Sequence, residues 1–195
     1  MLEALHTPHE SEMIFRHQGS FDGAELTVTY AVDRVEHEYR LDNGMAAVAD
    51  EFLLAALLSV PEDRLVRVDS RFEKALSTSS VAPLATVLQD PEGGVWAQRR
   101  AHPAANVIGI EIVSSSLRRG CSAAQRWAGY GPRTVQAPAK ASTFELTEAA
   151  HYGIGVITDE GQQLLSPAPF VPVRWSSARW RFAELVYAQF RELAG

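Results

Sequence analysis

One carboxylate, Glu111, interrupts the apolar run 107–113 (VIGIEIV), which is followed directly by three serines. An unpaired carboxylate that leaves water costs several kcal/mol or shifts its pKa, so a charge in a buried-type strand needs a specific role. Three roles are open. Glu111 could be a metal-binding acid or its remnant, a partner of a nearby arginine such as Arg99 or Arg126, or a solvent-facing side chain.

The segment 95–142 around Glu111 is basic, although the whole chain is acidic. The segment contains seven Lys and Arg residues against one acidic residue, while the formal net charge of the chain is −6. A negative net charge argues against a protein that coats nucleic acid by charge alone. Local arginines can still bind an anionic partner, or simply form a solvated surface. The candidate nucleic-acid-binding residues are Arg99, Arg100, Arg118, Arg119, Arg126 and Arg133.

The composition, with 46% hydrophobic and 22% charged residues in a chain of 195, is that of an ordinary globular protein. No apolar run approaches the roughly 20 residues of a membrane span, and residues 1–12 lack a basic-then-apolar signal pattern. We therefore expect a cytoplasmic protein with no membrane partner. The single cysteine, Cys121, allows no internal disulfide and fits a reducing compartment.

Hydrophobic periodicity and turn signals predict an α/β fold with a mixed central sheet flanked by helices. We expect one domain over residues 21–195, preceded by a possible flexible arm at 1–20. The expected strands are 25–41 (one strand or a hairpin), 64–72, 95–100, 107–113, 133–137, 154–158 and 162–165. The expected helices are 45–59, 77–89, 122–130, 147–152 and 176–193. The last helix is amphipathic, and its expected packing face is Trp180, Ala183, Leu185, Tyr187 and Phe190.

The stretch 107–170 resembles the second half of the PD-(D/E)XK nuclease fold, the restriction-endonuclease-like superfamily. Glu111-Ile112-Val113 lies at the position of that family's Glu-x-Lys strand. Gln125 and Tyr130, in QRWAGY, match a Gln and an aromatic on the helix that follows. The sequence TEAAHYGIGVITDEGQQ, residues 147–163, is similar to the closing helix and its "GIG" strand. The resemblance covers about a third of the chain and implies a restriction-endonuclease-like fold.

Two features depart from the family pattern. The lysine of the motif is Val113 here, and the upstream Asp has no clean match, although Asp69 and Asp90 precede the motif. Members of this family use two carboxylates to hold Mg²⁺ and a lysine to position water. Valine can neither bind a metal ion nor donate a hydrogen bond. The resemblance therefore implies a degenerate site, with Glu111, Asp69 and Gln125 as its remnant or rearranged residues.

Three functions follow as hypotheses. The first is a nucleic-acid-binding protein, or a non-catalytic subunit, that binds DNA or RNA through the arginines and needs no cofactor. The second is an active Mg²⁺-dependent nuclease in which Asp69 and Glu111 hold the metal and Lys74 or Gln125 replaces the lysine. The third is a protein-interaction module that has lost nuclease chemistry and binds a protein partner. Salt-sensitive binding, cleavage with Mg²⁺ or Mn²⁺, and capture of a partner distinguish them.

Overall fold

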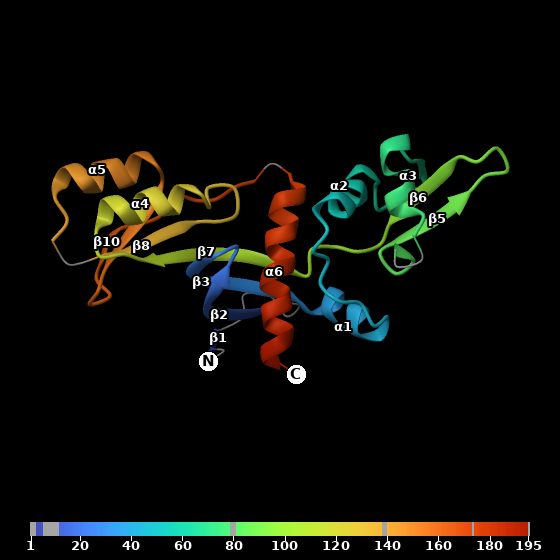
Figure 1. Cartoon of the computed structure of the whole chain (residues 1–195). Helices are drawn as coiled ribbons and strands as arrows, with labels where there is room; N and C mark the ends of the chain where they lie inside the picture. Colours follow the sequence, from blue (N-terminus) through green and yellow to red (C-terminus); the bar gives the residue numbers. More distant parts are fainter. Residues whose placement is uncertain (1–2, 6–11, 79–80, 138–139, 173, 195) are drawn as a thin grey trace. The chain divides into compact units, whose positions relative to one another are not determined.

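The computed structural model describes residues 3–5, 12–78, 81–137, 140–172 and 174–194 (Figure 1). The chain forms two compact units. Unit 1 comprises Met1–Val32 and Ala105–Val173, and unit 2 comprises Asp33–Ala104 and Arg174–Gly195. We expected one domain over 21–195 after an arm at 1–20. In the structure residues 12–20 belong to a strand, and unit 2 lies in the sequence between and after the two segments of unit 1.

Unit 1 contains a mixed sheet with the strand order β1-β2-β3-β7-β8-β9-β10. Its strands are β1 (Glu3–Leu5), β2 (Glu12–Phe21), β3 (Ala24–Asp33), β7 (Ala105–Val113), β8 (Arg133–Ala137), β9 (Ile154–Thr158) and β10 (Gln163–Leu165). Strands β7, β8 and β9 run parallel, and β3 and β10 pair antiparallel with β7 and β9. Parallel neighbours need crossover connections. Helices α4 (Leu117–Gln125) and α5 (Thr143–His151) supply them. The predicted mixed α/β class is confirmed.

A two-residue turn joins β2 to β3 and fixes this hairpin. Asp22 and Gly23 both have positive φ, 46° and 76°. A turn of this kind matches the right-handed twist of the flanking strands, and Asp-Gly is among its preferred sequences.

Helix α4 packs closely on one face of the sheet. A Cβ atom on Gly120 would lie 2.4 Å from the Val135 side chain on β8, so this helix position has no room for a larger residue. Ile110 and Ile112 of β7 are buried, and Ile112 shares a hollow with α4 residues. Because successive strand residues point to opposite faces, Glu111 lies on the face away from α4.

Unit 2 contains a small antiparallel sheet with the order β4-β6-β5. Its strands are β4 (Val66–Arg67), β5 (Ala85–Gln89) and β6 (Val95–Arg99), and its helices are α1 (Arg34–Asp42), α2 (Glu51–Ser59), α3 (Ser70–Leu76) and α6 (Ser177–Ala194). Leu54, Leu57 and Phe72 from the helices, together with Val95 and Trp180, belong to one hydrophobic core.

A buried ionic network joins α1 to α6 within this unit. Arg40, which is 0% exposed, donates 2.7 and 2.8 Å hydrogen bonds to the two carboxylate oxygens of Glu184 and a 2.7 Å bond to Glu36. Glu184 also accepts from the indole N–H of Trp180 and from the backbone N–H of Val48. These bonds satisfy the Glu184 carboxylate, as burial of a charge requires.

Two of the predicted elements were wrong in type, the first only in its second half. The expected strand or hairpin 25–41 ends at Asp33, whose carboxylate accepts from the backbone N–H groups of Val35 and Glu36 and begins α1. Residues 79–80 of the expected helix 77–89 lie outside the described residues, and its second half is a turn followed by strand β5, which pairs with β6. The Asp90 side chain holds the connecting turn by accepting from the N–H groups of Glu92 and Gly94.

Other predicted elements were right in type but wrong in extent. Asp50 caps α2, so the helix expected from residue 45 begins at Glu51. Asp69 caps α3, so the strand expected over 64–72 is reduced to Val66–Arg67. Helix α4 covers 117–125 instead of 122–130, and α5 covers 143–151 instead of 147–152. On α6, the predicted packing residues are buried except Leu185, which is half-buried. No helix among the described residues is long and apolar enough to cross a membrane.

Candidate functional site

Glu111 lies in the middle of the sheet of unit 1, in a row of polar side chains. It pairs in register with Thr27 on β3 and with Thr134 on β8. Residues in register on neighbouring strands share a face of the sheet. The face opposite α4 is therefore polar around Glu111.

Arg16 on β2 reaches Glu111 across the intervening strand β3. One terminal nitrogen of Arg16 lies 3.1 and 3.2 Å from the two carboxylate oxygens of Glu111. The side chains are 42% and 21% exposed, respectively. Of the roles open for Glu111, pairing with an arginine is the one seen, and the arginine comes from outside the basic segment 95–142.

A hollow of about 550 Å³ surrounds this pair, and we call it the Glu111 hollow. A second carboxylate, Glu25, lines it from β3, and Gln136 lines it from β8. Val113, at the position of the family's lysine, also lines it and is 65% exposed. Gln18 also lines it, so the Glu111 hollow combines two carboxylates, one guanidinium and two amides, an arrangement that can bind a polar ligand or a cation.

The other predicted site residues lie elsewhere. Asp69 belongs to unit 2, where its carboxylate caps α3 and lies 3.4 Å from Arg71. Lys74 is also in unit 2, on α3. Gln125 is exposed at the end of α4. Within the described residues, no group of three or more His, Cys, Asp or Glu side chains is placed to hold a metal ion.

A second hollow, the α4 hollow, lies between α4 and the start of β3. Arg119, Ser122 and Arg126 line it, and its volume is about 460 Å³. These residues follow the i, i+3, i+7 spacing of one helix face. Arg118 and Arg119 are exposed in the first turn of α4. Arg126 is exposed at the C-cap and donates a 2.9 Å hydrogen bond to the carbonyl of Asp22.

The remaining candidate arginines have structural contacts. Arg133 donates a 2.7 Å hydrogen bond to the carbonyl of Tyr152, and burial lowers its pKa. Arg99 and Arg100 belong to unit 2. Arg99 pairs with Glu62 and lies over the ring of Trp180, and Arg100 donates to the hydroxyl of Thr86. The basic segment therefore divides between the two units, and three of its exposed arginines, Arg118, Arg119 and Arg126, come from α4 and its C-cap.

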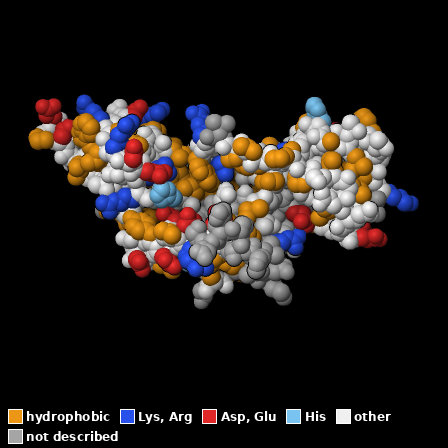
Figure 2. Space-filling view, turned by 180° about the vertical axis from the view of Figure 1, so that it is seen from behind, with side chains coloured by type: hydrophobic (Ala, Val, Ile, Leu, Met, Phe, Trp, Pro, Cys, Tyr) orange, Lys and Arg blue, Asp and Glu red, His pale blue; other side chains and the backbone are white. Residues whose placement is uncertain are grey.

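The charges on the face shown in Figure 2 are mixed. Basic and acidic side chains alternate over this face, with hydrophobic side chains between them. No field of one sign covers the described part of the face, so any binding of an anion there depends on particular arginines.

The "GIG" sequence has a structural reason. Gly153 has φ +66°, and a Cβ atom there would lie 2.9 Å from Ala168. A Cβ atom on Gly155 would lie 2.7 Å from Pro167. The proline-rich loop after β10 approaches β9 so closely that both positions favour glycine.

Cys121 is buried, and burial raises the pKa of its thiol, which keeps it protonated.

Sequence reasoning missed the two other charged residues of the Glu111 hollow, Arg16 and Glu25. Arg16 lies in a region expected to be an arm, and nothing in its surroundings pointed to Glu111, 95 residues away. Glu25 was assigned correctly to a strand. Its position beside β7 depends on the insertion of unit 2 between β3 and β7, which the sequence pattern did not show.

In comparisons with known proteins, no protein-family model, curated protein or solved structure matches the chain.

Proposed function

We propose that unit 1 is a non-catalytic, nucleic-acid-binding scaffold with a degenerate restriction-endonuclease-like architecture. The observation that carries the proposal is the placement of Arg118, Arg119 and Arg126 on and just after α4, all exposed. Arginine suits phosphate because its planar guanidinium presents several N–H donors to the phosphate oxygens.

The spacing along α4 fits a sugar–phosphate backbone. Arg119 and Arg126 line the same hollow and are seven residues apart, which corresponds to about 10 Å along a helix axis. Ser122 lies between them and offers a hydroxyl to the same ligand. Such contacts position a nucleic acid without reading its sequence, so binding to both DNA and RNA is expected.

The pairing of Glu111 with Arg16 supports the non-catalytic part of the proposal. A metal ion at Glu111 would compete with the guanidinium that already contacts both carboxylate oxygens. Val113 offers no donor in place of the lysine, so no group on β7 can orient a hydrolytic water beside Glu111. The scaffold then retains a nuclease-like sheet and uses α4 for binding.

Binding is tested by fluorescence anisotropy with labelled duplex DNA and RNA at several salt concentrations. For three phosphate contacts the logarithm of the affinity should fall with the logarithm of salt with a slope of about −2.7 on duplex DNA. The Arg119→Ala/Arg126→Ala double variant should weaken binding and reduce the slope by about 1.8. The matched control is Arg34→Ala, an exposed arginine of unit 2. Absence of binding at low salt, or an equal loss in the control, would reject the proposal.

A metal-dependent nuclease remains a second candidate because Glu25 lines the same hollow as Glu111. Two carboxylates on neighbouring strands are the minimum that Mg²⁺ chemistry of this type uses. Calorimetric titration with Mg²⁺ and Mn²⁺ distinguishes the candidates. Heat in the wild type that disappears in both Glu25→Gln and Glu111→Gln, together with cleavage of DNA or RNA, would favour the nuclease. No heat in the wild type and heat in Arg16→Ala would show that Arg16 occupies the metal position.

A further inference from the structure

Strand β5 is an edge strand of the small sheet and is longer than the other edge strands among the described residues. The edge strands β1, β4 and β10 have 3, 2 and 3 residues, whereas β5 has five, Ala85-Thr86-Val87-Leu88-Gln89. Proteins protect sheet edges with short strands, charged side chains or proline. The β5 sequence contains no charged residue, proline or glycine, so it is suited to pairing with another strand.

The hydrogen-bond pattern shows which backbone groups of β5 face the open edge. Arg100 donates its backbone N–H to Leu84, and Asp90 donates to Gly94, so these positions bond between β5 and β6. Strand residues alternate between bonding inward and outward. The N–H and C=O groups of residues 85, 87 and 89 therefore point away from β6.

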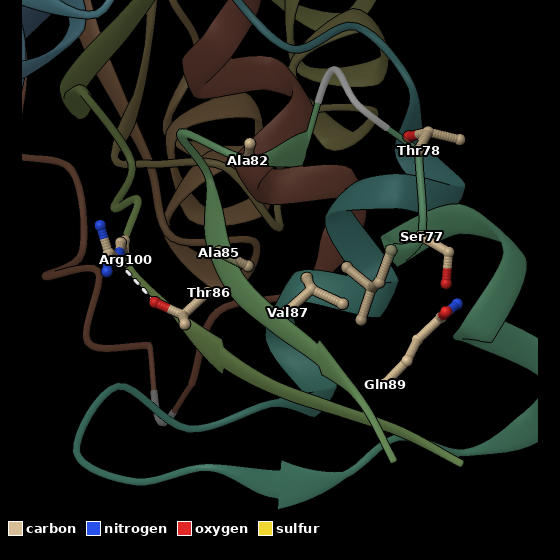
Figure 3. A pocket seen from close by; sticks show the side chains of 9 residues that line it. Ser77, Thr78, Ala82, Ala85, Thr86, Val87, Gln89 and Arg100 are labelled. Carbon is tan, nitrogen blue, oxygen red and sulfur yellow. Dashed lines mark hydrogen bonds between the residues drawn. The ribbon is translucent and has the colours of Figure 1, made fainter. Parts of the chain in front are cut away.

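A hollow of about 520 Å³ lies along this edge (Figure 3). Ala85, Val87 and Gln89 line it from β5, and Ser77 and Thr78 line it after the end of α3. In Figure 3 the side chains of Ser77 and Gln89 point toward each other across it.

We propose that β5 pairs with β5 of a second copy of this chain, antiparallel and centred on Val87, to form a homodimer with a continuous sheet. In this symmetric register Ala85 lies opposite Gln89 of the second copy, and Val87 lies opposite Val87. Ala85, Val87 and Gln89, whose backbone groups face outward, therefore pair with the same three residues of the second copy. This self-complementarity is what a two-fold interface requires.

Charge complementarity favours a second copy over an unrelated strand. One residue beyond each end of β5, the symmetric register places Leu84 opposite Asp90 of the second copy, and the backbone of Leu84 bonds to Arg100 in its own copy. Arg100 is exposed and extends over β5, where it bonds to Thr86 at 2.6 Å. Each Arg100 thus lies in the same row as Asp90 of the second copy, and the dimer contains this pair twice.

Exposed apolar side chains add contact area on the outer face of the same sheet. Leu88 and Trp96 are opposite each other on β5 and β6, and they are 52% and 38% exposed. In the dimer Leu88 would lie opposite Thr86 of the second copy. The two Leu88–Trp96 pairs then lie on one face of a six-stranded sheet, where packing between neighbouring strands stabilises the pairing.

The oligomeric state tests the proposal. In analytical ultracentrifugation over a concentration series, the wild type should be a dimer, and Leu88→Lys should shift it to monomer because a lysine on an edge strand opposes pairing. The matched control is Leu65→Lys, since Leu65 is an exposed leucine beside β4 and is 38% exposed. A wild type that stays monomeric, or a dimer that survives Leu88→Lys, would overturn the proposal.

The register is tested by a cysteine at the symmetry axis. Residues in a hydrogen-bonded antiparallel pair have Cα atoms about 5.5 Å apart, within the range of about 4.4–6.8 Å that a disulfide spans. Val87→Cys should therefore form a disulfide-linked dimer on oxidation. Thr86→Cys should not form this disulfide, because Thr86 lies opposite Leu88 of the second copy, two residues away from the second Thr86. Equal cross-linking of both variants would contradict the symmetric pairing.

Discussion

Both units contain an arginine–glutamate pair that links strands or helices far apart in sequence, yet their surroundings differ. In unit 2, Arg40 is fully buried, contacts both oxygens of Glu184 and also bonds to Glu36. In unit 1, Arg16 and Glu111 are 42% and 21% exposed and bond through one nitrogen. The Arg40 pair belongs to a buried network in which the charged groups are hydrogen-bonded. The Arg16 pair leaves some of its N–H donors and carboxylate lone pairs open to water.

The difference separates a structural role from a candidate functional one. A buried charge must be paired, and removal of one partner leaves the other uncompensated in a medium of low dielectric constant. A half-exposed pair costs little to break because water solvates both groups. The Arg16–Glu111 pair can therefore open at little cost, although a cation at Glu111 would still have to displace the guanidinium, whereas loss of Arg40 from Glu184 would destabilise the region around it.

The largest predicted effect follows from breaking the buried network. Glu184→Ala leaves the guanidinium of Arg40 and the N–H groups of Trp180 and Val48 without this carboxylate. The free energy of unfolding should fall by about 3–5 kcal/mol. The measurement is urea denaturation followed by tryptophan fluorescence. Glu192→Ala, an exposed glutamate on the same helix, is the control and should change it by less than about 0.5 kcal/mol. A similar small effect for Glu184→Ala would remove the distinction between the two pairs.

The sequence predicted the fold well where local signals agreed with the tertiary structure. Strands 95–100, 107–113, 133–137 and 154–158 were found within two residues of their bounds. Helix α1 was missed because apolar and polar residues alternate in places over 34–41 (RVEHEYRL), a pattern that is typical of a strand. Asp33 and Glu36 have the spacing that is typical of a helix N-terminus, and this signal was overlooked. A helix assigned there would have placed Glu36 and Arg40 at positions i and i+4, where they pair in the structure.

The candidate site was predictable only in part. Glu111 was identified because a charge in an apolar strand is a local feature. Its partner Arg16 and its neighbour Glu25 depend on the order of strands in the sheet, and β3 and β7 are separated in sequence by most of unit 2. Likewise, the basic segment 95–142 is continuous in sequence but its residues belong to both units, a division that the charge count alone did not show.

A second prediction concerns the excess negative charge of the buried network, in which two glutamates share one arginine. Burial raises the pKa of Glu36 above its ordinary value of 4.5, and the bond to Arg40 offsets this in part. As the pH rises from 4.5, the unfolded chain releases this proton before the folded chain does, so the contribution of Glu36 to stability decreases through this window.

The Glu36→Gln variant has no titratable group at this position, either in the folded or in the unfolded chain. The stability of the wild type relative to Glu36→Gln should therefore decrease from pH 4.5 toward neutrality, as measured by urea denaturation at several pH values. The matched control is Glu38→Gln, which removes an exposed glutamate of the same helix. If the relative stability of the wild type increased with pH, attraction to Arg40 would outweigh burial at Glu36.

The smallest predicted effect is that of Arg16→Ala on stability. Exposed ion pairs contribute about 0–1 kcal/mol, and Arg16 is 42% exposed, so the free energy of unfolding should fall by less than about 1 kcal/mol. A double-mutant cycle with Glu111→Gln isolates the pair, and its coupling energy should decrease as salt is added because mobile ions screen exposed charges. A coupling as large as that in the buried network, unchanged by salt, would mean that Glu111 is held as firmly as Glu184. The Glu111 hollow would then be a second structural centre, since a carboxylate held so firmly has no capacity left for a ligand.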